Sequence, residues 1–294
     1  MRRILITGAT SWIGSEVEAH LAAFPGGYGV ERVSLRADAW KERSWEGFDS
    51  ILHLAAASLE GPRALEQCLL VNRDLTVEVA NKAKTEGVRQ LIFTSTMHVY
   101  GAGSLESTSE PITFETEPRP ANPYGISKLA AERALTDLAE DGFGIAILRP
   151  PLVYGPGCCG NFALLAKLAR IAPIFPEVDN KRSMIFSRNL AELIRLIAED
   201  GRTGLFLPQD QEAVRTSNLV ALLASEQGSP IRLSKSLAPA ARVATRYSGK
   251  ARKMFGSSWY HPKASECGLN YHPFPFEESV RMTLGSSKSA GFKK

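Results

Sequence analysis

The chain has 294 residues, of which 44% are hydrophobic and 22% charged, a composition typical of a globular protein with one large domain or two modest ones. Its net charge of +4 is small and spread along the chain, which argues against a nucleic-acid partner. No apolar run approaches the ~20 residues of a membrane span, and no signal-peptide pattern precedes the first predicted strand. We therefore expect a cytoplasmic protein with no nucleic-acid and no membrane partner.

The cysteines and histidines form no metal-binding pattern. Cys68, Cys158, Cys159 and Cys267 include no Cys-x-x-Cys pair, and the histidines are scattered. This usage indicates reduced thiols rather than a disulfide framework, and it predicts no metal site.

The first predicted element is a buried parallel strand over residues 3–7, which runs into a glycine-containing turn and a helix through Leu21. Strand, glycine turn and helix form the context of a dinucleotide-binding site. Gly8 would permit the tight turn, and Gly14 would let the helix pack closely on the strand, with the helix N-terminus facing a pyrophosphate. Ser11 stands where the middle glycine of this motif usually lies. The candidate cofactor-binding residues of this turn are Gly8, Thr10, Ser11, Trp12, Ile13 and Gly14.

A second strand is predicted over residues 32–35 and is followed by Arg36. An acidic residue at this position would bind the ribose hydroxyls of NAD, whereas the planar fork of an arginine suits the 2′-phosphate of NADP. A solvated surface arginine explains Arg36 equally well. The cofactor therefore stays open between NAD and NADP, with a slight preference for NADP.

Only about a dozen residues separate this strand from the next, predicted over residues 50–54, which is too few for a crossover helix plus a further strand. We expect a trimmed sheet whose edge is covered by a loop carrying Trp40 and Trp45, rather than tryptophans stacked on an adenine. The third strand ends in Leu54-Ala55-Ala56, where small side chains would let a cofactor approach the backbone.

Asn72 lies near the start of the next predicted helix, which runs to about Lys84, and a helix cap explains it as well as a functional role does. A buried strand over residues 90–94 then opens onto Ser95-Thr96. Residues 103–120 are polar and acidic, and they predict a loop or flap.

The helix after this loop carries Tyr124 and Lys128, four residues apart and therefore on one face. A phenol ionises near pH ~10, and a neighbouring ammonium favours the phenolate and lowers its pKa. Such a pair can move a proton on or off a substrate hydroxyl while a cofactor carries hydride. The spacing is weak evidence by itself, because it also describes an ordinary solvated helix face.

Strands alternate with helices up to a strand at residues 145–148, which predicts an α/β fold with a doubly wound parallel sheet. Beyond Gly157 the alternation loosens. The pattern there predicts a proline-rich turn at residues 173–176, a strand at residues 205–207, and helices at residues 162–171, 190–198 and 217–226.

Six segments follow one another in a characteristic order: Thr7-Gly8…Gly14, His53-Leu54-Ala55-Ala56, Asn72, Ser95-Thr96…Val99-Tyr100-Gly101, Tyr124…Lys128 and Arg149-Pro150…Tyr154-Gly155-Pro156-Gly157. Together they resemble the extended short-chain dehydrogenase/reductases, the NAD-dependent epimerase/dehydratase family that acts on nucleotide sugars. The resemblance covers roughly residues 3 to 200, and the UDP-sugar 4-epimerases and 4-keto-sugar reductases fit best.

The resemblance implies a Rossmann-like domain at residues 1–157, to which residues 183–210 return, and a smaller mixed part at residues 158–182 and 211–284 that binds the nucleotide sugar. A flexible tail is expected at residues 285–294. A UDP-linked substrate is implied, and the family pattern is compatible with a homodimer.

The resemblance also implies residue roles. Tyr124 would be the catalytic acid/base, Lys128 would lower its pKa and hold the nicotinamide ribose, and Thr96 would hydrogen-bond the reacting oxygen, with Ser95 as its neighbouring substitute. Asn72 and Pro151 would join the cofactor site. Asn161 and Arg182 would bind the substrate, Arg182 through its diphosphate. Phe186 and Arg188 depart from the family pattern, which has His and Asp there.

Two activities at C4 of a nucleotide-bound hexose stay open. A 4-epimerase would hold its cofactor and recycle it, whereas a 4-keto-sugar reductase would exchange it. A non-catalytic protein that binds NAD(P) as a sensor or scaffold is the alternative from another class, which the joint presence of Tyr124, Lys128 and Thr96 disfavours.

Overall fold

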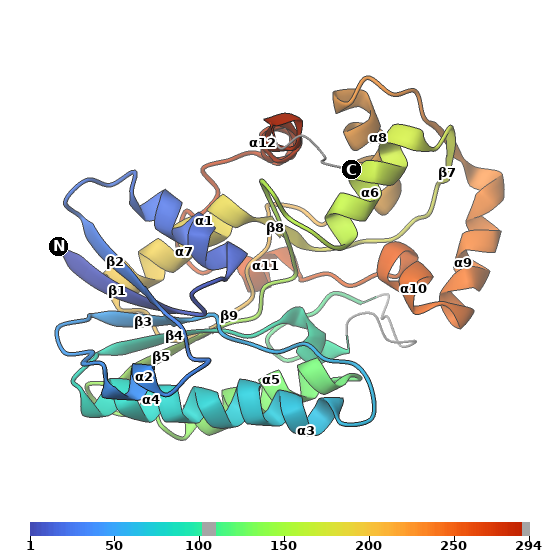
Figure 1. Cartoon of the computed structure of the whole chain (residues 1–294). Coiled ribbons are helices and arrows are strands. Elements are labelled where there is room, and N and C mark those ends of the chain that lie inside the picture. The colour runs from blue at the N-terminus through green and yellow to red at the C-terminus, as the bar shows by residue number, and fades with distance from the viewer. Residues whose placement is uncertain (102–109, 290–294) are drawn as a thin grey trace.

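The centre of the molecule is a parallel sheet of six strands in the order β2-β1-β3-β4-β5-β9. The computed structural model describes residues 1–101 and 110–289 (Figure 1). The order, which reverses beside β1, confirms the predicted Rossmann-like doubly wound sheet. The strands are β1 (Arg2–Thr7), β2 (Tyr28–Val33), β3 (Ser50–His53), β4 (Gln90–Thr94), β5 (Gly144–Leu148) and β9 (Gly204–Phe206).

Helices cover both faces of this sheet, because successive side chains of each strand point to opposite sides. In β1, Ile4 and Ile6 pack with α1 and α7, whereas Leu5 packs on the other side. Figure 1 shows these two helix layers above and below the sheet. The first layer is α1 (Trp12–Leu21) and α7 (Ser187–Asp200); the second is α3 (Ala64–Leu69), η1 (Leu70–Asp74), α4 (Leu75–Thr85) and α5 (Pro123–Thr136).

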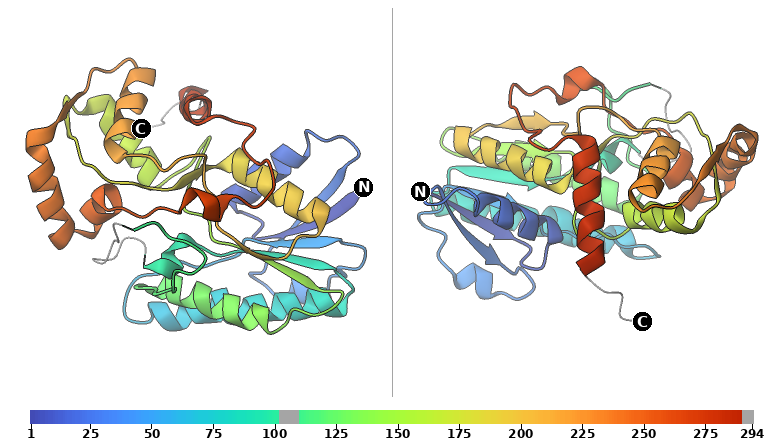
Figure 2. Two further views of the ribbon diagram at one scale, coloured as in Figure 1. Left: turned by 180° about the vertical axis from the view of Figure 1, so that it is seen from behind. Right: turned by 90° about the horizontal axis from the view of Figure 1, so that it is seen from above.

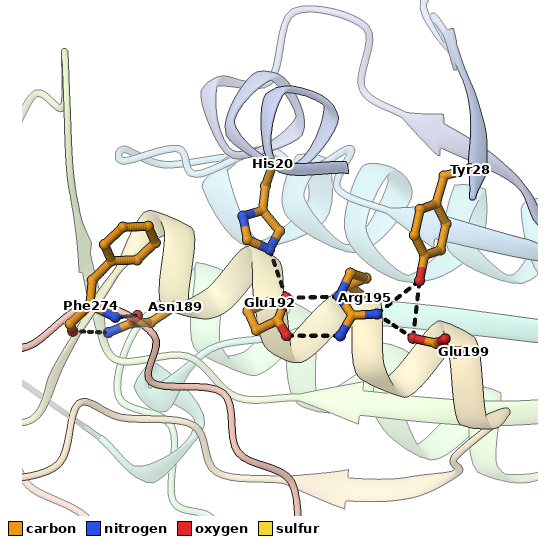
Figure 3. A network of polar contacts seen from close by, with 7 residues as sticks. All are labelled: His20, Tyr28, Asn189, Glu192, Arg195, Glu199 and Phe274. Atoms are coloured by element: carbon orange, nitrogen blue, oxygen red, sulfur yellow. Dashed lines mark hydrogen bonds and ion pairs between the residues drawn. The ribbon is translucent and has the colours of Figure 1, made fainter. Parts of the chain in front are cut away.

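Helix α7 is joined to α1 and β2 by a polar network (Figure 3). Glu192 lies 2.7 Å from Nε2 of His20 and 2.9 Å from the Arg195 guanidinium. Arg195 also donates to the Tyr28 hydroxyl at 3.0 Å and pairs with Glu199. The network fixes α7, which comes late in the chain, against the first βα unit.

The trimmed segment after β2 covers the sheet, and it includes one short helix, α2 (Ala39–Glu42). Trp40 and Trp45 expose 3% and 0% of their surface and pack in one cluster with Leu5 and Ile51. Both tryptophans therefore lie in the hydrophobic core on the sheet, in place of a full crossover helix.

The smaller lobe packs around Tyr154, Phe162 and Phe186, and it contains two short parallel pairs, β6 with β8 and β7 with β10. Helix α12 packs on the core of this lobe, and in the right view of Figure 2 it stands, in red, between the sheet and the helices of the smaller lobe. The strands are β6 (Leu152–Tyr154), β7 (Ile174–Pro176), β8 (Met184–Phe186) and β10 (Arg232–Ser234). The helices are α6 (Asn161–Ile171), α8 (Thr216–Glu226), η3 (Lys235–Leu237), α9 (Ala238–Tyr247), α10 (Gly249–Phe255), α11 (Pro262–Ser265) and α12 (Phe276–Ser289), and η2 (Met97–Tyr100) lies in the first lobe.

Several expected boundaries differ from the structure. Strand β2 begins four residues earlier than expected, at Tyr28, because pairing with β1 recruits a segment with little apolar character. The predicted turn at residues 173–176 contains β7, which pairs with a strand 58 residues away in the sequence (232 − 174). Such long-range pairing leaves no local sequence signal.

Residues 285–289 of the expected flexible tail belong to α12, which continues to Ser289. Buried Val280 and Thr283 anchor that helix on the lobe. Residues 290–294 of the tail, and residues 103–109 of the expected flap, lie outside the described residues. The division of the chain into a cofactor part and a substrate part stays a prediction.

Within the described ranges no helix is long and apolar enough to cross a membrane. The same residues contain no group of His, Cys, Asp and Glu placed to hold a metal ion.

Candidate active site

Gly8, Ala55, Ser95 and Thr96 follow the ends of β1, β3 and β4, and Pro151 follows β5, at the edge where ligands bind in open parallel sheets. Arg36 follows β2, whereas Asn161 and Arg182 belong to the smaller lobe. At this edge the glycine turn lies against the end of β3. A Cβ on Gly8 would lie 3.1 Å from the Ala55 nitrogen, and Gly8 has a φ of +81°. A Cβ on Gly14 would lie 3.3 Å from Ile6 and Leu54 side-chain carbons. Gly8 is therefore required by the close approach of the Ala55 backbone and by its positive φ, whereas Gly14 lets the helix pack tightly against side chains of the strands.

Ser11 replaces the middle glycine without strain, because its φ is −64°. Its side chain caps α1 by accepting a hydrogen bond from the Gly14 amide at 3.2 Å. Trp12 donates from Nε1 to the Pro156 carbonyl at 2.9 Å. This bond ties the glycine turn to the loop after β6, so the indole positions two loops at the edge of the site.

The end of β2 presents two arginines. Arg36 is exposed and lies three residues beyond the strand end at Val33. Arg32, which the sequence analysis did not single out, lies against the glycine turn: its guanidinium donates to the Ser11 carbonyl and to the Ser15 hydroxyl, both at 2.8 Å. The Arg36 side chain is thus accessible to a ligand, whereas the Arg32 side chain is hydrogen-bonded to the protein itself.

Asn72 lies inside a continuous helical stretch, within the π-helical turn η1, and not at a helix start as expected. The sequence analysis missed α3, although Ala64 and Cys68 are apolar at helical spacing. The Asn72 amide accepts from the Ala57 nitrogen at 2.7 Å and donates to the Ala57 carbonyl at 2.8 Å. It also donates to the Ser127 hydroxyl at 2.9 Å. Asn72 therefore joins the loop after β3 to helix α5 and is not a helix cap.

Tyr124 and Thr96 meet at this edge, where the Thr96 side chain favours the ionised phenol and so acts to lower the pKa of Tyr124, more weakly than burial raises it. Thr96 caps η2 by accepting from the His98 amide at 3.2 Å, and it exposes only 6% of its surface. Tyr124 lies in the first turn of α5, with its ring edge-to-face with His98. Burial raises the pKa of Tyr124 to about 12, and Cys68 adds to this effect. The phenol is consequently protonated in this structure.

Lys128 lies one turn further along α5 and is 1% exposed. Its ammonium donates to the Thr94 carbonyl at 2.8 Å and lies 4.4 Å from the centroid of the Phe93 ring. Burial lowers the pKa of Lys128 to about 7. The expected lowering of the Tyr124 pKa is therefore not what this structure shows, because desolvation is the largest influence on both groups.

Ser95 does not lie with Thr96 and Tyr124. Its hydroxyl donates to the carboxylate of buried Glu132, which in turn binds the Arg149 guanidinium. Successive residues of extended backbone point to opposite sides, so Thr96 faces the site when Ser95 faces the interior. The expected substitution of Ser95 for Thr96 does not fit this arrangement.

The N-terminus of α5 is held by residues that the sequence analysis also missed. Asn122 caps the helix by accepting from the Gly125 amide at 2.8 Å, and Pro123 follows at the first helical position. The Asn-Pro pair before Tyr124 is a recognisable start signal for a helix. Gly125 packs so closely on η2 that a Cβ there would lie 2.6 Å from the His98 carbonyl oxygen.

Arg182 is a partly buried cation at the entrance to β8. Its guanidinium donates to the Gly256 carbonyl at 3.2 Å, and no carboxylate of the described residues forms an ion pair with it. Burial lowers its pKa to about 10. A buried guanidinium without a carboxylate suits an anionic ligand.

The remaining candidates differ in exposure. Asn161 is exposed at the first position of α6, Ala56 is exposed after β3, and Pro151 is buried beside β6. His53 is fully buried between the Thr7 and Thr76 hydroxyls, and burial lowers its pKa to about 3, so it is a neutral structural residue.

These features fit a dinucleotide. The glycine turn leaves no room for side chains between Gly8 and Ala55, and the capped N-terminus of α1 faces the same edge. The small residues Ala55 and Ala56 flank the glycine turn after β3. The glycine turn and the end of β3 are thus brought together, while the side-chain polar groups of Ser11, Trp12, Asn72 and Lys128 bind the protein itself. The assignment of these residues to a cofactor stays a prediction.

Comparison with known proteins agrees with this geometry. Residues 4–205 match the model of the NAD dependent epimerase/dehydratase family. The chain is 30% identical to a UDP-glucose 4-epimerase of Vibrio cholerae over 76% of this chain and 75% of that protein. It is 28% identical to the GDP-6-deoxy-D-mannose reductase of Pseudomonas aeruginosa over 58% of this chain and 59% of that protein.

Solved structures share the fold. The Bordetella bronchiseptica enzyme WbmG in complex with NAD and UDP superimposes with a TM-score of 0.76 at 21% identity, over 98% of this chain and 94% of that one. RMD from Pseudomonas aeruginosa, complexed with NADPH, gives 0.76 at 20% identity, over 97% and 99%. With its glycine turn, its Tyr124–Lys128 helix and this family match, the chain belongs to the NAD-dependent epimerase/dehydratase family and is an NAD(P)-dependent enzyme of the extended short-chain dehydrogenase/reductase type.

Proposed function

We propose that this enzyme oxidises or reduces C4 of a hexose bound to a nucleotide, with UDP as the nucleotide, and that Tyr124 is its acid/base. The observation that carries this proposal is that Thr96 lies beside the phenol of Tyr124, one helical turn from Lys128, at the carboxyl edge of the sheet.

Tyr124 would give a proton to the O4 oxygen or take it from there. The protonated phenol of this structure is the form that donates, as a reduction requires. Thr96 can donate to and accept from the same oxygen and would orient it. Removal of a proton from O4 requires a lower Tyr124 pKa, and Lys128 would supply this if its ammonium turned from the Thr94 carbonyl toward the phenol.

The glycine turn from Gly8 to Gly14 and the small residues Ala55 and Ala56 would hold the cofactor, with Lys128 and Pro151 near its nicotinamide end. When bound, the nicotinamide accepts hydride from C4 or returns hydride to it. The protein contributes position and exclusion of water, because Thr96 and Lys128 are almost entirely buried.

Arg182 and Asn161 would bind the diphosphate and its sugar. The absence of an ion-pair partner for Arg182 among the described residues supports this role, and WbmG, which shares the fold, was solved with UDP. In this scheme residues 158–182 and 211–284 form the substrate part, and a homodimer would pair through helices that include α5.

A 4-epimerase is the first candidate, since the Vibrio cholerae relative has that name. A 4-keto-sugar reductase is the second, and exposed Arg36 favours it because the guanidinium suits the extra phosphate of NADP. The two candidates share the same proton-transfer residues and differ in whether the cofactor leaves.

Identification of the nucleotide released on denaturing the purified protein separates the candidates: near-stoichiometric NAD indicates the epimerase, and an empty protein that prefers NADPH indicates the reductase. UDP-glucose turnover, or reduction of a UDP-4-keto sugar, is then compared with that of Tyr124→Phe. We expect a loss of roughly 10²–10⁴-fold in kcat with cofactor binding retained. Unchanged turnover would refute the role of Tyr124.

A further inference from the structure

The segment between Glu226 and Glu266 contains no acidic residue. A surface that is merely solvated normally mixes both signs of charge. The chain as a whole nearly balances its charges, so this segment concentrates the excess positive charge, and the expectation that the charge is spread along the chain is wrong. Its basic residues are Arg232, Lys235, Arg242, Arg246, Lys250, Arg252, Lys253 and Lys263.

These charges lie mainly on helices α9 and α10, which pack against each other at the outer end of the smaller lobe. Figures 1 and 2 show α9 at the end of the molecule farthest from the sheet. None of the basic residues of α9 and α10 forms an ion pair with a carboxylate of the described residues. The positive charge there is therefore uncompensated and accessible.

Apolar side chains share this surface with the charges. On α9, Arg242, Val243, Arg246 and Tyr247 lie on one helical stripe, while Ala241 is buried on the opposite face. Tyr247 exposes 85% of its surface and Val243 53%. Leu237, just before α9, exposes 37%. A tyrosine and two aliphatic residues thus remain in water beside two arginines.

We propose that this surface, formed by Leu237, the α9 stripe and Lys250, docks the enzyme on a membrane that carries anionic lipids. Basic and apolar residues on one helix face are the features of a helix that lies in a lipid interface: the cations meet the headgroups, and the apolar side chains enter the acyl boundary. Charge alone would also suit a nucleic acid, but exposed Val243 and Leu237 offer nothing to a phosphate backbone. The lipid is therefore the favoured partner, and this proposal replaces the expectation from the sequence that the protein has no membrane partner.

Docking through α9 leaves the glycine turn and Tyr124 uncovered, because both belong to the first lobe (Figure 1). The surface lies in the part of the chain proposed to hold the substrate, but none of its own residues has a role in the reaction proposed above. If the enzyme failed to bind lipid, the proposed reaction would still stand. If the proposed reaction were refuted, the lipid proposal would still stand.

The test is co-sedimentation of the full chain with phosphatidylcholine vesicles that contain or lack phosphatidylglycerol. We expect binding only to the anionic vesicles, and weaker binding as salt rises. The Arg242→Gln/Arg246→Gln variant should lower the partition coefficient on the order of 30-fold, since each cation near an anionic surface contributes about fivefold. The Val243→Gln/Tyr247→Gln variant keeps the charge and should lower it roughly tenfold.

Arg63→Gln/Arg133→Gln is the matched control, because it removes two exposed, unpaired charges from the first lobe. It should bind anionic vesicles as the wild type does, and thermal melting should show that all variants are folded. Three outcomes overturn the proposal: no binding to anionic vesicles, an equal loss in the control, or no effect of Val243→Gln/Tyr247→Gln. A competition experiment identifies the other partner. If an oligonucleotide displaces the vesicles equally well from the wild type and from Val243→Gln/Tyr247→Gln, the surface is a nucleic-acid site and the proposal is overturned.

Discussion

Arg149 and Glu132 form a two-pronged ion pair in the interior behind the candidate active site. The Arg149 Nε atom lies 3.0 and 3.1 Å from the two carboxylate oxygens. Ser95 donates to the same carboxylate, and the guanidinium also binds the Tyr100 hydroxyl. The pair joins α5, which carries Tyr124, to the end of β5.

We predict that Glu132→Met lowers the free energy of unfolding by about 3–5 kcal/mol, because it leaves the Arg149 guanidinium buried without its partner. The double variant Glu132→Met/Arg149→Met should recover much of this loss, since neither charge is then buried. Urea unfolding of the two variants checks this. A double variant as unstable as the single one would show that the charges matter less than the volume they fill.

Lys128 should make stability depend on pH. Burial lowers its pKa to about 7, whereas the unfolded chain has a lysine pKa near ~10.4. Between these values the unfolded state binds more protons, so stability is lost as pH falls from about 10 to about 7. Lys128→Met removes this slope. The melting temperatures of the wild type and of Lys128→Met, measured without cofactor, should therefore differ by an amount that changes between about pH 10 and about pH 7. A difference that stays constant over this range would contradict the lowered pKa of Lys128.

Gly125→Ala should disturb the active site although it adds only a methyl group. The new Cβ would lie 2.6 Å from the His98 carbonyl oxygen, so α5 must move away from η2 and take Tyr124 from Thr96. We expect a loss of turnover on the order of 10²-fold, as for a small misplacement of a reacting group. Gly249→Ala is the control, since nothing lies within 4 Å of its new Cβ. Equal turnover in both variants would refute the close contact.

Arg36→Asp should shift cofactor preference from NADP toward NAD. The guanidinium is exposed beyond β2 and suits a phosphate, whereas a carboxylate repels a phosphate and can accept from ribose hydroxyls. We expect the ratio of the NADPH and NADH dissociation constants to rise at least about tenfold. Arg63→Asp makes the same charge change elsewhere. If this ratio of dissociation constants is unchanged in Arg36→Asp as well as in Arg63→Asp, Arg36 is a solvated surface residue with no role in cofactor preference.

The sequence by itself determined the Rossmann sheet and the residue types at its carboxyl edge. Buried strands such as residues 90–94 are short apolar runs, and Gly8 is needed because the backbone after β3 approaches too closely for a side chain. The Tyr124–Lys128 spacing likewise places both on one helix face. These features are local, so they can be recognised within a few residues.

Only the tertiary structure decided what the polar groups do. Ser95 and Thr96 are neighbours with similar side chains, yet the direction of the chain after β4 sends one to Glu132 and the other to Tyr124. Asn72 binds Ala57 and Ser127, and β7 pairs with β10, through contacts between segments distant in sequence. Burial then sets the pKa values of Tyr124 and Lys128, because desolvation depends on every element packed around them and not on their spacing along one helix.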